Sequence, residues 1–436
     1  MKRLKDKINV NIIEMISILV IISVLTVSSI GSILVTYHYL SLKQLSYFLI
    51  FFIPFEIILY LLTKIKCFKF NKKEILVFIL FILTGLSLIG SNKLSISIWG
   101  FYNRYEGLLV IYSYYSVALL TSTINSDYYK KIIIGFILLI GFINVGYGLF
   151  QTGIIPIDIG VKDSWKYARG FYGNSMYFAS LISICYFFVV GMLIVSEKKF
   201  DWKIFLLIIF FTIGNVMSGS MALFCTSIFI YIILIISELI GIKFKYFSKV
   251  RLLKIIGCIL LFVLLNIIYI NKDQNYKRDV ETLSREISTI SEVKKSDNSF
   301  GTGRVYIWKE VLKKAKDHLI FGVGVDNLYY SFEPRLVDPV SGYSVDKAHN
   351  DYLQKLVCEG IFSFICYVVL LVIIVLDNFR SKDKIRMVLF LGFFAYITQI
   401  FFSISVIRVS TVYWIILGLL MSNEVVIKKR KKYRLI

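Results

Sequence analysis

Apolar residues follow one another in long runs along this chain, and most charged residues lie between the runs. A helix needs roughly 20 apolar residues to cross the ~30 Å hydrocarbon layer of a bilayer. Twelve runs meet or approach this length, at residues 12–35, 45–62, 75–89, 108–120, 132–150, 177–195, 204–217, 221–240, 255–270, 356–376, 387–402 and 409–426. The pattern predicts an all-α polytopic membrane protein with about 12 transmembrane helices, and a hydrophobic content of 57% excludes a soluble domain.

The basic residues are distributed unevenly between the runs. Of the 50 Lys and Arg residues, 29 lie in the two terminal segments and every second connection, seven in the other short connections, and 14 in one long segment after the ninth run. Because Lys and Arg are retained on the cytoplasmic side in short loops, both termini are expected in the cytoplasm. Topology and anionic lipid account for most of the net charge of +22, which does not indicate nucleic-acid binding.

Three parts follow from this topology. Residues 1–271 hold nine transmembrane helices with short loops, 272–355 form an extracytoplasmic loop, and 356–436 hold three helices and a basic cytoplasmic tail. Apolar residues recur at helical spacing within 279–293 and 306–319 of the loop, which predicts two amphipathic helices. The second helix sets four lysines against an apolar stripe of Trp308, Val311, Leu312, Ala315 and Leu319, a pattern typical of a helix lying at a membrane surface or capping a bundle.

Topology does not require the outer cations, so they are candidates for binding. Arginine grips phosphate or carboxylate through two parallel hydrogen bonds. The outer arginines are Arg104, Arg169 and Arg408 in short loops and Arg304 and Arg335 in the long one. The alternative for each is snorkelling at the interface or pairing with a nearby acid such as Glu106.

His349 is the leading candidate for a catalytic base. Only three histidines occur, and imidazole exchanges a proton near neutral pH. His349 lies just before the tenth run, flanked by Asp346, Asn350 and Asp351, whereas His38 and His318 have the character of ordinary surface residues. A metal site made of Asp346, His349 and Asp351 is the less favoured alternative, and no outer loop carries a D-x-D clamp for Mg²⁺.

The order of motifs resembles the O-antigen ligase-like family, which includes O-antigen ligases and polymerases. TGRVYIWKEVLKKAKDHLIFGVGVDNLYY and DKAHNDYLQKLVCEGIF resemble the family's R-x3-W, G-x-G and H-N-x-Y-L elements. WGFYNRYEGLL, ARGFYGNSMYFAS and SGSMALF resemble earlier family segments, so the resemblance runs from about Ser97 to Phe364. It implies a fold related to the membrane glycosyltransferases (GT-C-like), with the long outer loop between helices 9 and 10.

The resemblance also implies a reaction. The expected activity moves a glycan from an undecaprenyl-pyrophosphate donor to an acceptor hydroxyl on a glycan or wall polymer, at the outer face of the bacterial cytoplasmic membrane, without metal or cofactor. His349 matches the loop histidine that activates the acceptor, and Arg304 and Arg169 match arginines that hold the pyrophosphate. Further substrate contacts are expected from Arg104, Arg408, Asn350, Asp346, Trp308, Tyr105 and Asn174. Where many members carry an arginine at a mid-chain helix, this chain has Gly219, Ser220 and Met221, so Arg408 or Arg104 is the expected substitute.

Two questions stay open at this level. A ligase and a polymerase differ only in their acceptor, which the sequence does not distinguish. The alternative from another class is a 12-helix transporter or flippase of lipid-linked glycans, which would depend on carboxylates within the spans such as Glu56 and Glu238.

Overall fold

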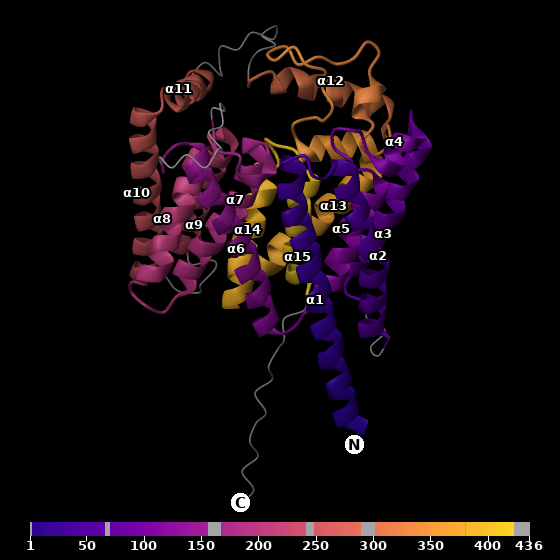
Figure 1. The fold of residues 1–436 in the computed structure, drawn as a ribbon, viewed down its shortest axis with the longest axis horizontal. Helices are drawn as coiled ribbons and strands as arrows, with labels where there is room; N and C mark the ends of the chain where they lie inside the picture. The colour runs from indigo at the N-terminus through magenta and orange to yellow at the C-terminus, as the bar shows by residue number, and fades with distance from the viewer. Residues whose placement is uncertain are drawn as a thin grey trace, which may run out of the picture.

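The computed structural model describes residues 2–65, 70–155, 167–240, 248–288, 301–379 and 381–422 (Figure 1). These residues form helices and no strand apart from one isolated bridge between Val337 and Ser344. The helices are α1 (Lys2–Thr36), α2 (Leu42–Lys64), α3 (Lys72–Leu86), η1 (Ser87–Gly90), α4 (Leu94–Trp99), α5 (Leu108–Ser122), α6 (Asp127–Gln151), η2 (Gly170–Tyr172), α7 (Ser175–Val195), α8 (Trp202–Met217), α9 (Met221–Ile240), α10 (Lys249–Lys272), α11 (Gln274–Ser288), α12 (Arg304–Asp317), η3 (Leu328–Ser331), α13 (Asp351–Phe379), α14 (Lys384–Gln399) and α15 (Ile407–Met421).

Each of the twelve predicted apolar runs contains a helix, which confirms the all-helical membrane character. Eight helices are long and apolar enough to cross a bilayer, namely α1, α2, α3 with η1, α6, α7, α9, α10 and α13. The other four, α5, α8, α14 and α15, have 15 or 16 residues. At 1.5 Å per residue they cover about 22 to 24 Å, less than the ~30 Å layer. The described structure therefore supports eight spans by length, and the total of twelve stays a prediction.

Connections alternate between the two ends of the bundle. At one end, Glu14 near the start of α1 accepts hydrogen bonds from the backbone N–H groups of Asn125 (3.1 Å) and Ser126 (3.0 Å), which precede α6. Asn71, before α3, donates to the carbonyl of Met421 at the end of α15 (3.2 Å). Figure 1 shows α11 and α12 at the opposite end from the N-terminus. The long loop and the N-terminus thus lie at opposite ends, while the assignment of one end to the cytoplasm stays a prediction.

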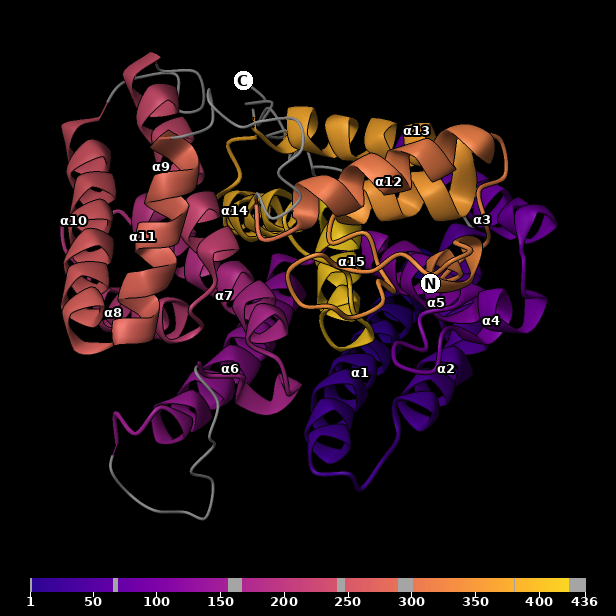
Figure 2. The ribbon, with the colours of Figure 1, turned by 90° about the horizontal axis from the view of Figure 1, so that it is seen from above.

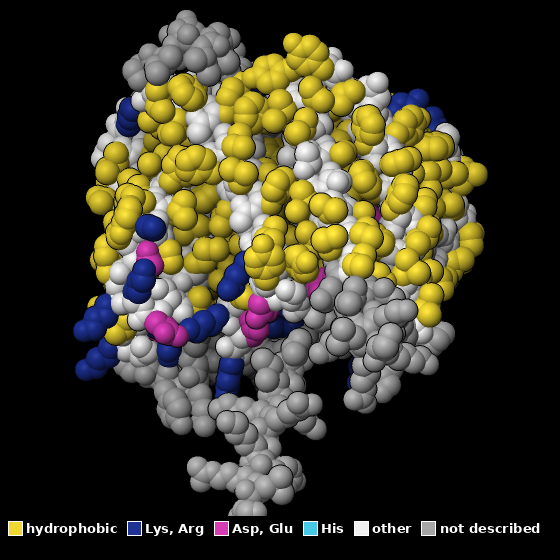
Figure 3. All heavy atoms as spheres, turned by 60° about the horizontal axis from the view of Figure 1, so that its bottom comes forward, with side chains coloured by type: hydrophobic (Ala, Val, Ile, Leu, Met, Phe, Trp, Pro, Cys, Tyr) yellow, Lys and Arg dark blue, Asp and Glu magenta, His cyan; other side chains and the backbone are white. Residues whose placement is uncertain are grey.

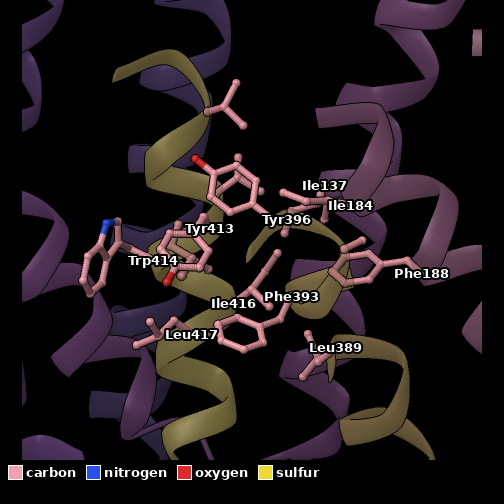
Figure 4. Packing of buried hydrophobic residues seen from close by; sticks show 14 of the residues in the cluster. Ile137, Ile184, Phe188, Leu389, Phe393, Tyr396, Tyr413, Trp414, Ile416 and Leu417 are labelled. Atoms are coloured by element: carbon pink, nitrogen blue, oxygen red, sulfur yellow. The ribbon is translucent and has the colours of Figure 1, made fainter. Parts of the chain in front are cut away.

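The interior of the bundle is built around α5, α7, α14 and α15. Because α7 is apolar on every side, it is suited to full burial, and 89% of its most apolar window is buried. Figure 4 shows aromatic rings packed between these helices. The ring of Tyr413 stacks on those of Tyr396 (centroids 4.6 Å apart) and Phe393 (5.8 Å). This rigid centre supports the polar groups at the outer end.

Helix α13 is broken near its start by Gly360, whose φ of 81° is left-handed. A Cβ at this position would lie 2.1 Å from the carbonyl oxygen of Ile320, so only glycine fits. The segment that follows α12 crosses α13 at Gly360. Val323 and Gly324 donate from their backbone N–H groups to the carbonyls of Val357 (2.9 Å) and Cys358 (3.0 Å). The predicted G-x-G element thus pins the outer segment to α13.

The predicted amphipathic helices are present as α11 and α12, although residues 289–293 of the first prediction lie outside the described residues. Figure 2 shows α12 lying across α13. Its buried face consists of Ile307, Val311 and Ala315. Two residues of the predicted stripe, Leu312 and Leu319, are exposed, whereas Ile307, Val311 and Ala315 pack in one cluster with Val357 and Cys358 of α13. The packing of this buried face over the bundle accounts for the amphipathic pattern of α12.

Candidate active site

His349 lies in the last residues before α13, between two anchored neighbours. Ala348 donates its backbone N–H to the side-chain oxygen of Gln354 (2.8 Å), and Asn350 accepts a hydrogen bond from the backbone N–H of Leu353 (3.0 Å). The backbone of His349 itself has a φ of 52°, a left-handed conformation that is costly for a side chain of this kind. The surrounding contacts therefore impose the orientation of this half-buried imidazole.

Charged groups surround the imidazole on both sides. Burial lowers the pKa of His349, the positive charges of Arg304 and Arg104 lower it further, and the carboxylates of Asp346 and Asp338 oppose the shift. The net effect is a pKa below the usual value, which favours the neutral ring near pH 7. This is the protonation state that a general base requires.

Arg104 lies in the turn between α4 and α5 and is held by a carboxylate from the long loop. Its guanidinium donates to both oxygens of Asp346, at 2.8 and 3.1 Å, and also to the hydroxyl of Tyr177 in α7. The suggested partner for an outer arginine, Glu106, pairs instead with Lys347. Arg104 thus connects the turn before α5 with the His349 segment and with α7.

Arg169 and Arg408 converge on one turn, residues 170–173. Arg169 donates its backbone N–H to the side-chain oxygen of Gln151 (3.0 Å), and its guanidinium lies 3.5 Å from the carbonyl oxygen of Gly173. Arg408, at the start of α15, donates to the carbonyl of Tyr172 (2.5 Å) and to the hydroxyl of Thr36 (3.0 Å). This turn is followed directly by α7, whose Tyr177 contacts Arg104.

The remaining predicted site residues have structural contacts. Arg304 begins α12 near His349, and burial lowers its pKa, opposed by Glu286 and Asp338. Trp308 packs edge-on against Phe401 (centroids 5.6 Å apart). The Asn174 side chain caps α7 through the N–H of Met176 (2.8 Å), as Asn350 caps α13, and Tyr105 has a left-handed φ of 50°.

The structure therefore brings His349, Asp346, Arg104 and Arg304 into one electrostatic cluster at the end of the bundle opposite the N-terminus. Arg169 and Arg408 form a second group at the 170–173 turn, joined to the first through Tyr177. Asn174 is exposed at the edge of this group, and Trp308 faces the loop before α15.

Sequence reasoning missed the buried polar layer beneath His349. Glu106 binds Lys347 and accepts hydrogen bonds from Tyr114 (2.8 Å) and Ser410 (3.2 Å). Asp326 accepts from the backbone N–H of Phe101 (2.7 Å). These groups line a cavity of about 70 Å³. In the sequence, Glu106, Asp326 and Lys347 could have been noticed because they lie inside the motifs NRYEG, VGVDN and DKAHN.

The alternative metal site has no support from these contacts. Asp346 is engaged by Arg104, and Asp351 accepts a hydrogen bond from the backbone N–H of Ser405 (3.1 Å). Across the described part of the chain, no group of three or more His, Cys, Asp or Glu side chains is arranged to hold a metal ion.

An apolar cavity of about 500 Å³ lies between α9, α13 and α14. Its wall includes Phe229, Tyr352, Ile397 and Phe401. Phe401 is also the residue against which Trp308 packs, so the cavity reaches the outer edge of the bundle under α12.

Comparison with known proteins agrees with these features. No curated protein matches the chain. Residues 203–368 match the protein family described as O-antigen ligase. The matched part runs from α8 into α13 and contains Arg304, Trp308 and His349, whereas Arg104, Arg169 and Arg408 lie outside it. Over residues 203–368, the chain is therefore similar to the O-antigen ligase family.

Proposed function

We propose that the protein is a membrane glycosyltransferase that moves a glycan from an undecaprenyl-pyrophosphate donor to an acceptor hydroxyl on a surface polysaccharide or wall polymer. The family match supports a function of the O-antigen ligase or polymerase type. The observation that carries the finer proposal is the half-buried His349 held among Arg304, Arg104 and Asp346, on the segment that leads into α13.

His349 acts as the general base in this proposal. The acceptor hydroxyl gives its proton to the imidazole while its oxygen forms a bond to the anomeric carbon of the donor. The bond between that carbon and the pyrophosphate oxygen breaks, and the lipid pyrophosphate leaves with the electron pair. Such a base contributes about 10² to 10⁴ in rate, and the in-line displacement predicts inversion at the anomeric carbon.

Arginines stabilise the departing pyrophosphate, for which Arg304 and Arg169 are the first candidates. The family arginine missing at Gly219, Ser220 and Met221 has its best substitute in Arg408. Its hydrogen bonds go to two neutral oxygens, so its positive charge remains available for phosphate. The charge of Arg104, in contrast, is largely balanced by Asp346.

The proposed binding site of the polyprenyl chain is the apolar cavity beside Trp308. A lipid-linked donor must keep its chain in hydrocarbon while its pyrophosphate reaches the arginines. The cavity meets the first need because Phe229, Ile397 and Phe401 line it, and it lies beside α12, which begins with Arg304. Filling it by Thr226→Trp should weaken donor use without changing the His349 cluster.

The test is the length distribution of undecaprenyl-pyrophosphate-linked glycans in cells that carry His349→Gln at matched expression. His318→Gln is the matched control, because His318 is a second outer histidine at the end of α12. Single repeats accumulate in His349→Gln if the protein is a polymerase, and long lipid-linked chains accumulate if it is a ligase.

Glu56→Gln distinguishes an enzyme from a transporter. Glu56 is 1% exposed, and its described partner is the Ser116 hydroxyl. A transporter that uses span carboxylates would lose activity with Glu56→Gln and keep it with His349→Gln, and that pattern would overturn the proposal.

A further inference from the structure

A second apolar cavity lies at the end of the bundle that carries the N-terminus, far from the His349 cluster. It has a volume of about 280 Å³ and lies between α7, α8 and α10. Apolar side chains from all three helices form its wall, including Leu193, Ile208, Leu253 and Leu261. Cavities of this size are rare in packed protein interiors.

The depth of the cavity matches one leaflet. Its lining residues on α10 lie within the twelve residues from Val250 to Leu261, which rise about 16 Å along the helix. This is roughly half of the ~30 Å hydrocarbon layer. Gly257 widens the cavity, because no atom lies within 4 Å of where its Cβ would stand. The space therefore suits one acyl chain of the adjacent leaflet.

The mouth of the cavity is basic. The segments 196–203 and 248–254 carry six Lys and Arg residues and two acids. Lys198 pairs with Asp201 (3.2 Å) and Arg251 with Glu238 (3.0 Å). Lys199 lines the cavity, is exposed, and forms no ion pair with any residue that the structure describes.

A second lysine lies deeper in the mouth. Lys254 donates to the carbonyls of Leu193 (3.0 Å) and Ser196 (2.7 Å), which leaves the third hydrogen of its ammonium group for another acceptor. Figure 3 shows Lys and Arg side chains gathered with acids along the edge of a broad hydrophobic surface at this end. Lys199 and Lys254 both line the cavity, so they are the candidate contacts for a phosphate group at its mouth.

We propose that this cavity binds an anionic phospholipid of the adjacent leaflet, with one acyl chain along α10 and the headgroup phosphate at Lys199 and Lys254. Basic pockets between membrane helices recognise anionic headgroups in this way, and the apolar wall supplies chain contacts that free phosphate lacks. The site is distinct from the proposed glycan site and does not depend on it.

Native mass spectrometry of the full chain in detergent, with phosphatidylglycerol or phosphatidylcholine added, tests the proposal. The wild type should retain phosphatidylglycerol several-fold better. Lys199→Gln should weaken its binding about fivefold, and Gly257→Leu should reduce both lipids by filling the cavity. Both changes are compatible with folding, because Lys199 is exposed and leucine favours a helix more than glycine does.

Matched controls come from α6. Lys131→Gln removes an exposed lysine at the same end, and Gly135→Leu adds a side chain where no atom lies within 4 Å, so neither should change lipid binding. Equal retention of the two lipids by the wild type, or unchanged retention in Gly257→Leu, would overturn the proposal. Displacement of phosphatidylglycerol by millimolar inorganic phosphate would overturn it too, since that identifies a phosphate site and not a lipid site.

Discussion

The buried ion pair of Lys347 and Glu106 gives the sharpest prediction about how the His349 segment is held. Both side chains are 4% exposed. The pair joins the segment before α13 to the turn before α5. Lys347 also donates to the carbonyl of Ser405 (3.1 Å), which ties in the loop before α15. Lys347→Met removes the cation and leaves the Glu106 carboxylate buried.

Breaking a buried pair by removing one partner costs about 3 to 5 kcal/mol, because the remaining charge has lost its compensation. Lys347→Met should lower the free energy of unfolding by that amount. The double variant Lys347→Met/Glu106→Gln removes both charges, so it should recover about 2 kcal/mol or more of that loss. Lys309→Met on the exposed face of α12 is the control and should change stability by less than about 0.5 kcal/mol.

Equilibrium unfolding of the full chain in detergent measures these differences, and Trp414, which lines the polar cavity, reports them by fluorescence. A loss below about 1 kcal/mol in Lys347→Met, with simple additivity in the double variant, would refute the reasoning. It would mean that water or protonation of Glu106 compensates the charge.

Three further outcomes follow from the same contacts. Arg304→Gln removes a positive charge that lowers the pKa of His349, so the acid limb of the pH–activity profile should move to higher pH. An unchanged acid limb would show that Arg304 does not influence the titration of His349. Burial raises the pKa of Asp326 to about 6, against roughly 3.9 in an unfolded chain. The protonated carboxyl therefore contributes to the free energy of unfolding below about pH 4. This contribution, up to roughly 3 kcal/mol, should be lost as the pH rises through about 6. Asp326→Asn should abolish this slope in unfolding measured against pH, and a slope that persists would assign it to another group. Gly360→Ala should cost more than about 2 kcal/mol in the same assay, since its φ of 81° and the contact with Ile320 exclude a Cβ; a neutral result would show that the α13 break can shift.

The sequence by itself determined the membrane class and the positions of the helices. Bilayer thickness imposes a length on apolar runs, so each predicted run contains a helix, and α12 follows from helical spacing in the loop. The sequence also indicated His349 and the outer arginines, because topology gives no reason for basic residues there. It did not predict the exposed positions Leu312 and Leu319, since periodicity does not specify which face a neighbour covers.

Only the tertiary structure decided which charges meet. Asp346 lies 242 residues from Arg104, and Lys347 lies 241 residues from Glu106, so no local pattern links them. Along the sequence, a charged residue has several possible partners. The fold selects one of them by bringing the two side chains close together in a buried place. The same holds for the break at Gly360, where a crossing segment makes glycine necessary, and for the two apolar cavities, which exist only between packed helices.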